Sequence, residues 1–243
     1  MQLFNALTDK VTHKLNKKII AVIMAGGEGS RMKRDYKTEK PLLKIKAKRL
    51  IEYVIEALSK SPYFYKIVAC VSQNAINTMK FLQDYNYNLD PPLEIIEGYG
   101  NGYSNDLSFI IENFFEYIIF MVSADVPLLS EIDIMNILSK CDFNATCYSI
   151  IFDKKIVDEI CIKPSVVFEY RKKNYCYSGI TIFNLKKRKR KNNFNLINER
   201  YLIMNSIGIA VNVNEKKDLL VARNLSKIRF NKYGKNVSNN NSR

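Results

Sequence analysis

The residues best suited to chemistry lie between Ile19 and Ile45. An apolar run, Ile19 to Met24, leads directly into the segment Ala25-Gly26-Gly27-Glu28-Gly29, in which three of the last four residues are glycine. A backbone with so few side chains can turn sharply and bring several N–H groups against a phosphate. Arg31 adds a planar guanidinium that matches phosphate oxygens, and Lys40 adds a second cation. Together these residues indicate a nucleoside triphosphate site.

Two better-known phosphate motifs do not fit this segment. A Walker loop requires G-x-x-x-x-G-K-[ST], and no lysine follows Gly29 at the required position. A dinucleotide-binding loop requires a third glycine where Met32 stands. The glycines alone would also suit an ordinary strand-to-helix turn beside a salt-bridged arginine. It is the combination of AGGEGSRM with EKPLL at residues 39–43 that is specific.

A second informative stretch runs from Gly98 to Asp106, where three glycines alternate with Tyr99, Asn101 and Tyr103. Glycines such as Gly102 allow a flat base or a ribose to approach the backbone, and Asn105 and Asp106 can form hydrogen bonds with it. A carboxylate could accept from both the N1–H and the 2-amino group of guanine. Alternatively, Asp106 is a first-turn acid in a helix that Ser104 would cap.

Asp125 follows a fully apolar run, Tyr117 to Val122, that predicts a buried strand. Mg²⁺ usually takes only one or two protein carboxylates together with triphosphate oxygens, so one aspartate at the end of a central strand can hold it. The alternative role of Asp125, capping the next helix, suits Ser130 better. Ser72 ends another expected strand, at residues 66–71, where a nucleotide could bind.

The apolar spacing predicts the elements that would position these residues. Strands are expected at 19–24, 66–71, 93–96, 117–122, 145–152, 177–183 and 207–213, and helices at 49–60, 74–85, from about 104, at 132–140 and at 215–226. This alternation of strands and helices predicts a three-layer α/β/α Rossmann-like fold with a mostly parallel central sheet. In such a sheet, ligands bind at the carboxyl ends of the strands.

The net charge of +14 is concentrated in three segments. Residues 1–18 hold four basic residues and one acid, residues 186–191 (KKRKRK) six basic residues, and residues 227–243 five basic residues and no acid. The rest of the chain holds 23 basic and 23 acidic residues. Because a nucleic-acid-binding domain usually carries its charge on a structured face, this distribution favours solvated segments over nucleic-acid binding. We expect an extension at 1–18, one domain at 19–226 and a disordered basic tail at 227–243.

Composition narrows the class of protein further. No apolar run approaches the ~20 residues needed to span a bilayer, and the first 18 residues are too polar for a secretory signal. The five cysteines form no C-x-x-C pair, and the single histidine, His13, lies outside the expected domain. These features argue against a zinc site and favour a reducing, cytoplasmic location.

The motifs resemble those of a known superfamily. AGGEGSRM followed by EKPLL is similar to the nucleotidyltransferases that include sugar-nucleotide pyrophosphorylases and molybdenum-cofactor guanylyltransferase, and this resemblance implies a GT-A-like fold over residues 19–226. The sequences SADVPLL at 123–129 and VNVNEKKDLLVARNL at 211–225 resemble the metal motif and the closing segment of that superfamily. GNGYSNDL at 100–107 most resembles the archaeal-type GTP:adenosylcobinamide-phosphate guanylyltransferases.

This resemblance implies transfer of GMP from GTP to adenosylcobinamide phosphate, with release of pyrophosphate. It implies that Arg31 contacts the β/γ-phosphates, Lys40 the α-phosphate and Asp125 a Mg²⁺ ion. It also implies that the backbone of the glycine segment binds phosphates, through Ala25, Gly26, Gly27 and Gly29. Nucleotide contacts are implied for Ser72, Gly102, Asn105 and Asp106. Two alternatives stay open: another acceptor, such as molybdopterin or a sugar phosphate, and a nucleic-acid-binding protein that uses the basic segments. A homodimer also stays open.

The sequence departs from the family pattern in three places. The spacer between Arg31 and Lys40 is longer than usual, and Asn101 replaces a common lysine. No acid precedes the strand expected at 207–213, where Asn205 and Ser206 are weak substitutes. A second protein ligand for the metal is therefore doubtful.

Overall fold

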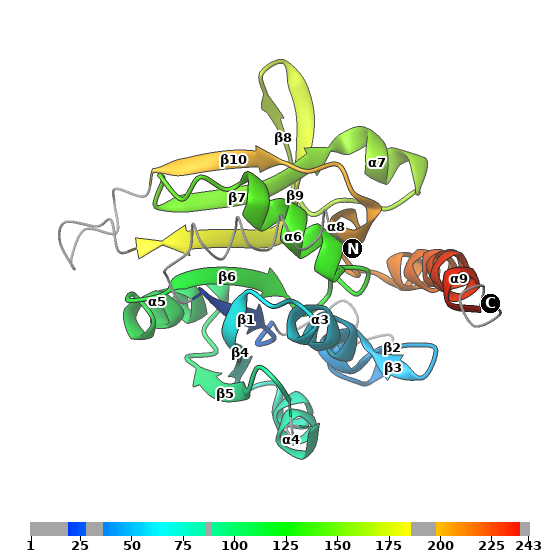
Figure 1. Ribbon diagram of the computed structural model, residues 1–243. Helices are drawn as coiled ribbons and strands as arrows, with labels where there is room; N and C mark the ends of the chain where they lie inside the picture. Colours follow the sequence, from blue (N-terminus) through cyan, green and yellow to red (C-terminus); the bar gives the residue numbers. More distant parts are fainter. Residues whose placement is uncertain (1–18, 28–35, 86–88, 186–197, 239–243) are drawn as a thin grey trace.

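The computed structural model describes residues 19–27, 36–85, 89–185 and 198–238, with residues 228–238 as backbone only. This part of the chain forms one eight-stranded sheet and a two-stranded sheet (Figure 1). The strands of the large sheet are β1 (Ile19–Met24), β4 (Phe64–Ser72), β5 (Leu93–Gly98), β6 (Ile118–Ser123), β7 (Cys147–Asp153), β8 (Val167–Tyr170), β9 (Lys173–Asn184) and β10 (Glu199–Ile203). The small sheet pairs β2 (Lys44–Ile45) with β3 (Lys48–Arg49).

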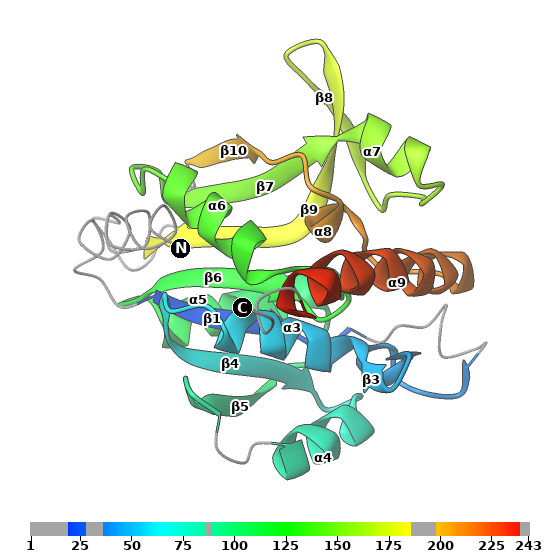
Figure 2. The ribbon, with the colours of Figure 1, turned by 45° about the vertical axis from the view of Figure 1, so that its right-hand side comes forward.

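Helices connect most of these strands. They are η1 (Lys40–Leu42), α3 (Leu50–Ser59), α4 (Ile76–Tyr85), α5 (Tyr103–Asn113), α6 (Glu131–Lys140), α7 (Lys154–Glu159), α8 (Ile207–Ala210) and α9 (Lys216–Ser238). Viewed as in Figures 1 and 2, α3 and α6 lie in front of the sheet and α5 lies behind it. The sheet therefore forms the middle of three layers.

The sheet has the strand order β10-β7-β9-β6-β1-β4-β5, with β8 paired to β9. β1 runs parallel to both of its neighbours, β4 and β6, and β5 runs parallel to β4. β9 is antiparallel to β6, β7 and β8, whereas β10 runs parallel to β7. The prediction of a three-layer α/β/α fold with a mostly parallel sheet is confirmed.

Hydrophobic side chains fill the space on both faces of the sheet. On one face, α3 and α6 bury residues such as Ile55 and Ile134 against Ala21 and Phe120 of β1 and β6. On the other face, a smaller cluster packs Ile110 and its neighbours in α5 against β1, β4 and β6. Burial on both faces explains why the strands are almost continuously apolar.

Three local predictions are wrong. The strand expected at 207–213 begins instead with α8, because the Ser206 hydroxyl accepts from the N–H of Gly208 (3.1 Å) and donates to Asp133 Oδ1 (2.6 Å), which starts a helical turn. Ser104 does not cap α5, since that helix begins one residue earlier, after Gly102 at φ 100°. α9 continues to Ser238, well past residue 226.

The basic loop at 186–191 and the extension at 1–18 lie outside the described residues. The element described after the loop is the strand β10, which the sequence analysis did not predict. Within the described ranges, no helix combines the length and the apolar character that crossing a membrane requires. The five cysteines are free thiols.

Candidate active site at the carboxyl edge of the sheet

Two predicted site residues, Lys40 and Asp125, form an ion pair at the carboxyl edge of the sheet. They lie 85 residues apart in the sequence, and Lys40 Nζ donates directly to Asp125 Oδ2. Asp125 follows β6, while Lys40 begins η1, so the pair joins two separate loops. The other carboxylate oxygen, Asp125 Oδ1, is buried and has no hydrogen-bond partner within the described residues. A buried carboxylate oxygen without a donor is suited to a cation.

Asn214 completes this cluster, and its role was missed in the sequence. Its Oδ1 accepts from Lys40 Nζ at 2.9 Å, and its Nδ2 donates to Ser165 Oγ at 3.1 Å. The carboxylate of Asp218 accepts from the backbone N–H groups of Asn214 (2.9 Å) and Glu215 (2.8 Å) and so fixes the turn before α9. The available signal was the family's closing segment, in which an asparagine stands four residues before an aspartate.

The environment of Asp218 is mixed. The pKa of this carboxyl is raised above its usual value, mainly by loss of water on burial and also by the charge of Glu215, although the two N–H donors and, least of all, the charge of Lys40 act in the opposite direction. Its contact with Lys40 is indirect, through Asn214.

Glu39 explains why Lys40 is held in place. Its side chain is almost fully buried, and its two carboxylate oxygens accept from the N–H of Asn77 (2.9 Å), the N–H of Thr78 (2.7 Å) and the Thr78 hydroxyl (2.6 Å). These donors belong to the first turn of α4, where a negative charge is favourable. Glu39 thus anchors the start of η1 to another helix.

The glycine segment after β1 is only partly described, since Gly29 and Arg31 lie outside the described residues. Ala25 donates its N–H to the carbonyl of Cys70 at 2.8 Å, which continues the pairing of β1 with β4. A Cβ at Gly26 would lie 3.0 Å from both Asp106 Oδ2 and the Ser72 nitrogen. Gly26 is therefore required by close packing, whereas a Cβ at Gly27 would meet no atom within 4 Å.

Asp106 lies beneath the second glycine segment. It is 3 % exposed, and its Oδ1 accepts from the N–H of Gly100 at 2.9 Å. A Cβ at Gly98 would come within 2.6 Å of the same oxygen, so glycine is needed there. The carboxylate is turned into the protein, toward β5, rather than to the exposed side of the segment.

The remaining predicted nucleotide contacts lie around this carboxylate. Gly102 has an open environment at φ 100°, and Asn105 is exposed and donates through Nδ2 to the carbonyl of Asn101 at 2.9 Å. Ser72 is 1 % exposed, and its hydroxyl has no hydrogen-bond partner among the described residues. The structure therefore brings Ser72, Gly26 and Asp106 together.

The two groups of residues border the same edge of the sheet. Met24, the last residue of β1, pairs with Cys70 of β4 on one side and with Ser123 of β6 on the other. The Met24 carbonyl also accepts from the N–H of Ala124 at 3.1 Å. The glycine segment after β1 thus lies between Ser72 and the loop that carries Asp125.

The donor set fits Mg²⁺ better than zinc. The described residues contain no cluster of three or more histidine, cysteine, aspartate or glutamate side chains able to hold a metal ion. Mg²⁺ needs few protein ligands when a triphosphate supplies the others, and Asp125 Oδ1 offers one free oxygen. The amide oxygen of Asn212 in the neighbouring segment is also buried without a partner in the described part of the chain.

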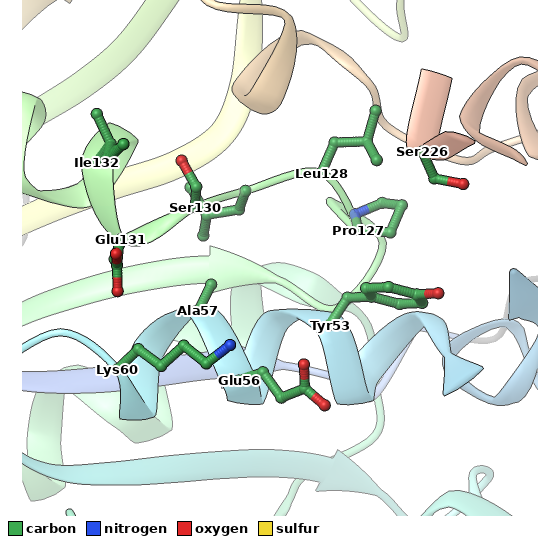
Figure 3. Close-up of a pocket in the computed structure, with 11 residues that line it drawn as sticks. Tyr53, Glu56, Ala57, Lys60, Pro127, Leu128, Ser130, Glu131, Ile132 and Ser226 are labelled. Carbon is green, nitrogen blue, oxygen red and sulfur yellow. The ribbon is translucent and has the colours of Figure 1, made fainter. Parts of the chain in front are cut away.

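A separate cavity of about 260 Å³ lies on the other side of the Asp125 loop (Figure 3). Tyr53 and Glu56 of α3 and Lys60, the residue after that helix, line it together with the segment from Pro127 to Ile132, and Ser226 of α9 lies at one end. None of the predicted site residues that the structure describes lines this cavity. It adjoins the Asp125 loop without forming part of the candidate active site.

The fold and this edge define a class of protein. The structure resembles CMP:2-keto-3-deoxy-manno-octonic acid synthetase in complex with CTP, with a TM-score of 0.65 and 16% identity over 87% of this chain and 99% of the other. It also resembles 4-diphosphocytidyl-2C-methyl-D-erythritol synthase from Anaerococcus prevotii, with a TM-score of 0.58 and 14% identity over 92% and 99% of the two chains. At these identities the likeness establishes the fold, which is the GT-A-like fold of nucleotidyltransferases.

The chain belongs to the family of MobA-like NTP transferase domains, whose profile matches residues 21–166. Adenosylcobinamide-phosphate guanylyltransferase from Methanocaldococcus jannaschii is 35% identical over 112 residues, which cover 46% of this chain and 55% of that relative. The chain therefore spans about half the length of this curated relative. The residues that match the family profile include the glycine segment after β1, Lys40 and Asp125.

Proposed function

We propose that this protein is a guanylyltransferase that transfers GMP from GTP to adenosylcobinamide phosphate, releasing pyrophosphate. Membership of the NTP transferase family and the name of the 35%-identical relative support this proposal. The observation that supports it best is the Lys40–Asp125–Asn214 cluster beside the glycine segment, because it combines a cation with a carboxylate oxygen that has no partner among the described residues, a pair suited to a metal-bound triphosphate. The free thiols fit a cytoplasmic location.

The proposed reaction needs little covalent participation by the protein. A phosphate oxygen of the acceptor attacks the α-phosphorus of GTP and forms a new P–O bond, while the bond from the α-phosphorus to the bridging oxygen breaks and pyrophosphate leaves with that electron pair. The acceptor phosphate is already ionised near neutral pH, so no general base is required. Catalysis then consists of holding the two phosphates in line and neutralising their charge.

Lys40 and Asp125 would divide the electrostatic work. Asp125 would hold Mg²⁺, which supplies charge neutralisation to the triphosphate when bound. Lys40 neutralises Asp125 in this structure and would serve the α-phosphate of the nucleotide. Asn214 Oδ1 orients the ammonium group by accepting a hydrogen bond from it. Arg31 is proposed to contact the β- and γ-phosphates.

The nucleotide would lie along the two glycine segments. We propose that backbone N–H groups of Gly26, Gly27 and Gly29 contact phosphates and that the Ser72 hydroxyl, unpartnered in the described structure, donates to the nucleotide. Gly102 and Asn105 would border the base and ribose. Asp106 would contribute to nucleotide binding indirectly. Its carboxylate accepts from the N–H of Gly100 and would thereby fix the backbone that borders the guanine.

The experiment is a pyrophosphate-release assay with Mg²⁺ and a matrix of substrates. Each of GTP, ATP and CTP is combined with adenosylcobinamide phosphate, molybdopterin or glucose 1-phosphate, and products are identified by mass spectrometry. We expect rapid release only for GTP with the corrinoid phosphate, yielding adenosylcobinamide-GDP. Turnover with one of the other acceptors instead would retain nucleotidyl transfer but replace the acceptor. No release from any pair would contradict the proposal.

A further inference from the structure

A cluster of aromatic rings lies on three neighbouring strands beyond the candidate active site. It is formed by Phe168 and Tyr170 of β8, Tyr177 of β9 and Tyr201 of β10, and we call it the aromatic surface. The rings of Phe168 and Tyr177 are stacked with centroids 4.7 Å apart, and the ring of Tyr201 lies 5.2 Å from Phe168 and 5.0 Å from Tyr170. Figure 1 shows these strands at the top of the molecule.

The aromatic surface faces solvent on the side of the sheet away from the larger core. The helices that contact β9 in this region, α7 and α8, bury Val157 and Ile209 in that larger core and so occupy the opposite face. Tyr177 is 37 % exposed, whereas Phe168, Tyr170 and Tyr201 are half-buried, and the neighbouring Ile203 is 36 % exposed. Ile151 pairs with both Tyr177 and Ile203 and is fully buried between them.

One chain segment connects this surface directly to the Lys40 cluster. Ser165 Oγ accepts from Asn214 Nδ2, and Asn214 in turn accepts from Lys40. Phe168 follows Ser165 by only three residues. At ~3.3 Å per extended residue, the backbone of Phe168 lies at most about 10 Å from that of Ser165, which contacts the cluster through Asn214.

A second segment makes the same connection from β9. Gly179 has φ +75°, and a Cβ there would lie 3.3 Å from Ser123 Cβ, at the end of β6. Ser123 precedes Asp125 by two residues, and Tyr177 precedes Gly179 by two residues. The aromatic surface is therefore adjacent to the carboxyl edge where transfer is proposed to occur.

The chemistry of the surface favours a large flat ligand that also carries negative charge. Aromatic rings bind the faces of planar groups, and tyrosine hydroxyls can form hydrogen bonds with polar groups at the edge of such a ligand. The Tyr177 and Tyr201 hydroxyls lie 3.4 Å apart, and Tyr201 also donates to Glu199 at 3.5 Å, so a ligand would have to exchange these long contacts for its own. The turn between β8 and β9 adds three exposed basic residues, Arg171, Lys172 and Lys173, and the Arg171 guanidinium lies 5.1 Å from the Tyr170 ring.

We infer that the aromatic surface binds the ring system of the acceptor while the acceptor's phosphate reaches the Lys40–Asp125 pair. A phosphorylated corrinoid has a flat macrocycle, polar amides at its edge and an anionic group, which match the rings, the hydroxyls and the basic turn. This inference rests on the proposed function and adds a binding surface for the acceptor that is separate from the nucleotide site. Small phosphorylated acceptors would make no use of it.

The test replaces one ring by an aliphatic side chain. Tyr201→Leu removes the ring that contacts Phe168, Tyr170 and Tyr177, and Tyr65→Leu makes the same change at an exposed tyrosine near the start of β4, stacked on Tyr117. Binding of cobinamide, which lacks the phosphate, is measured by equilibrium dialysis from its visible absorbance. Steady-state assays give KM for adenosylcobinamide phosphate and for GTP, and circular dichroism checks folding.

We expect Tyr201→Leu to raise the Kd for cobinamide and the KM for the acceptor about tenfold or more, with KM for GTP unchanged and Tyr65→Leu equal to wild type. Phe168→Leu should reproduce the result and replaces Tyr201→Leu if the latter unfolds.

Unchanged cobinamide binding in variants that still turn over would overturn the inference and leave the proposed function standing. A wild-type protein that neither binds cobinamide nor uses the corrinoid phosphate would overturn both. If the wild type sediments as a dimer, and a ring variant sediments as a monomer that still binds cobinamide, the surface would be assigned to contact with a second copy of the chain instead.

Discussion

At the level of residues, the contact between Lys40 and Asp125 links the two groups on which transfer would depend. Each neutralises the other in the absence of substrate, and each is mostly but not fully buried. A cation and a carboxylate that are shielded from water interact more strongly than an exposed pair. Removing either charge should therefore lower stability as well as turnover, so folding must be measured alongside activity.

Replacing Lys40 by alanine should lower kcat/KM by roughly 10²-fold, because it removes a charge-assisted contact to a phosphate in the transition state. Steady-state kinetics with GTP and the acceptor measure this. Lys80→Ala, which removes an exposed lysine from α4, provides the matched control and should behave as wild type. Activity of Lys40→Ala within threefold of wild type would remove this lysine from the site.

Asp125→Asn should abolish Mg²⁺-dependent turnover while the protein stays folded. The substitution preserves size and leaves an amide that can still hydrogen-bond, but it removes the charge that would hold the metal and that pairs with Lys40. Turnover across a Mg²⁺ titration and the thermal melting curve are measured together. A variant that unfolds, yet turns over normally per folded molecule, would show that Asp125 has a structural role only.

The base preference tests the role of Asp106. GTP should be used at least 10²-fold better than ATP, with ITP between them, because each buried polar group left unpaired costs ~1–3 kcal/mol. Asp106→Asn retains an oxygen that can accept from Gly100 N–H, so it should keep this order if Asp106 acts by positioning the backbone. Asp106→Ala should lower kcat/KM for all three nucleotides. Loss of the order in Asp106→Asn would instead support direct contact with guanine, and equal use of ATP and GTP by wild type would contradict the guanine assignment.

At the level of elements, the site depends on a helix that contributes no predicted site residue. The first turn of α4 donates three hydrogen bonds to Glu39, directly before Lys40. The carboxylate satisfies N–H groups that have no partner within the helix, as an N-terminal cap does. The position of Lys40 is therefore set partly by a helix between β4 and β5.

Glu39→Ala should lower the free energy of unfolding by about 1–3 kcal/mol, since the two buried donors of Thr78 and the N–H of Asn77 lose their acceptor. It should also lower kcat/KM, because Lys40 would lose its fixed starting point. Glu39→Gln offers an oxygen to the same donors and should recover most of the stability. Urea denaturation and kinetics on the three proteins check this, and equal stability of the alanine variant would show that water replaces the carboxylate at no cost.

At the level of the whole molecule, the net charge and the candidate site belong to different parts of the chain. The basic excess lies in residues 1–18, 186–191 and 227–243, whereas the domain between them is balanced. The contacts that the structure describes for α9 come before residue 228: Arg223 donates to the carbonyl of Lys44 at 2.9 Å, and Leu219 and Ala222 belong to the core. We therefore expect nucleotidyl transfer not to depend on the basic terminal segments.

Deletion of residues 1–18 and 228–243 should leave GTP-dependent transfer essentially unchanged. Any binding of the full chain to duplex DNA should weaken steeply with salt and should decrease on truncation, since it would depend on exposed basic residues. Transfer kinetics and a salt-dependent DNA-binding titration measure the two effects. A truncated protein that folds but cannot turn over would show that the terminal segments belong to the catalytic unit.

The sequence alone predicted most of the main strands and helices and the edge at which the candidate site lies, but not β8, β10 or α7. Continuous apolar runs such as Ile19–Met24 indicate strands buried on both faces, and such strands place the residues that follow them at one edge of a parallel sheet. Glycines, lysines and aspartates at those positions were therefore visible as candidates. Local signals failed where a side chain from elsewhere starts a turn, as Asp133 does at Ser206 and α8.

Only the tertiary structure decided which of these residues meet. Asn214 contacts Lys40 across 174 residues, Glu39 reaches the first turn of α4, and Asp106 points beneath Gly100 rather than outward. The aromatic surface likewise arises from three strands that pair through β9 and β7. Sequence periodicity encodes which face of its own element a residue occupies. Strand order and chain packing set its distant partners, and no local pattern carries that information.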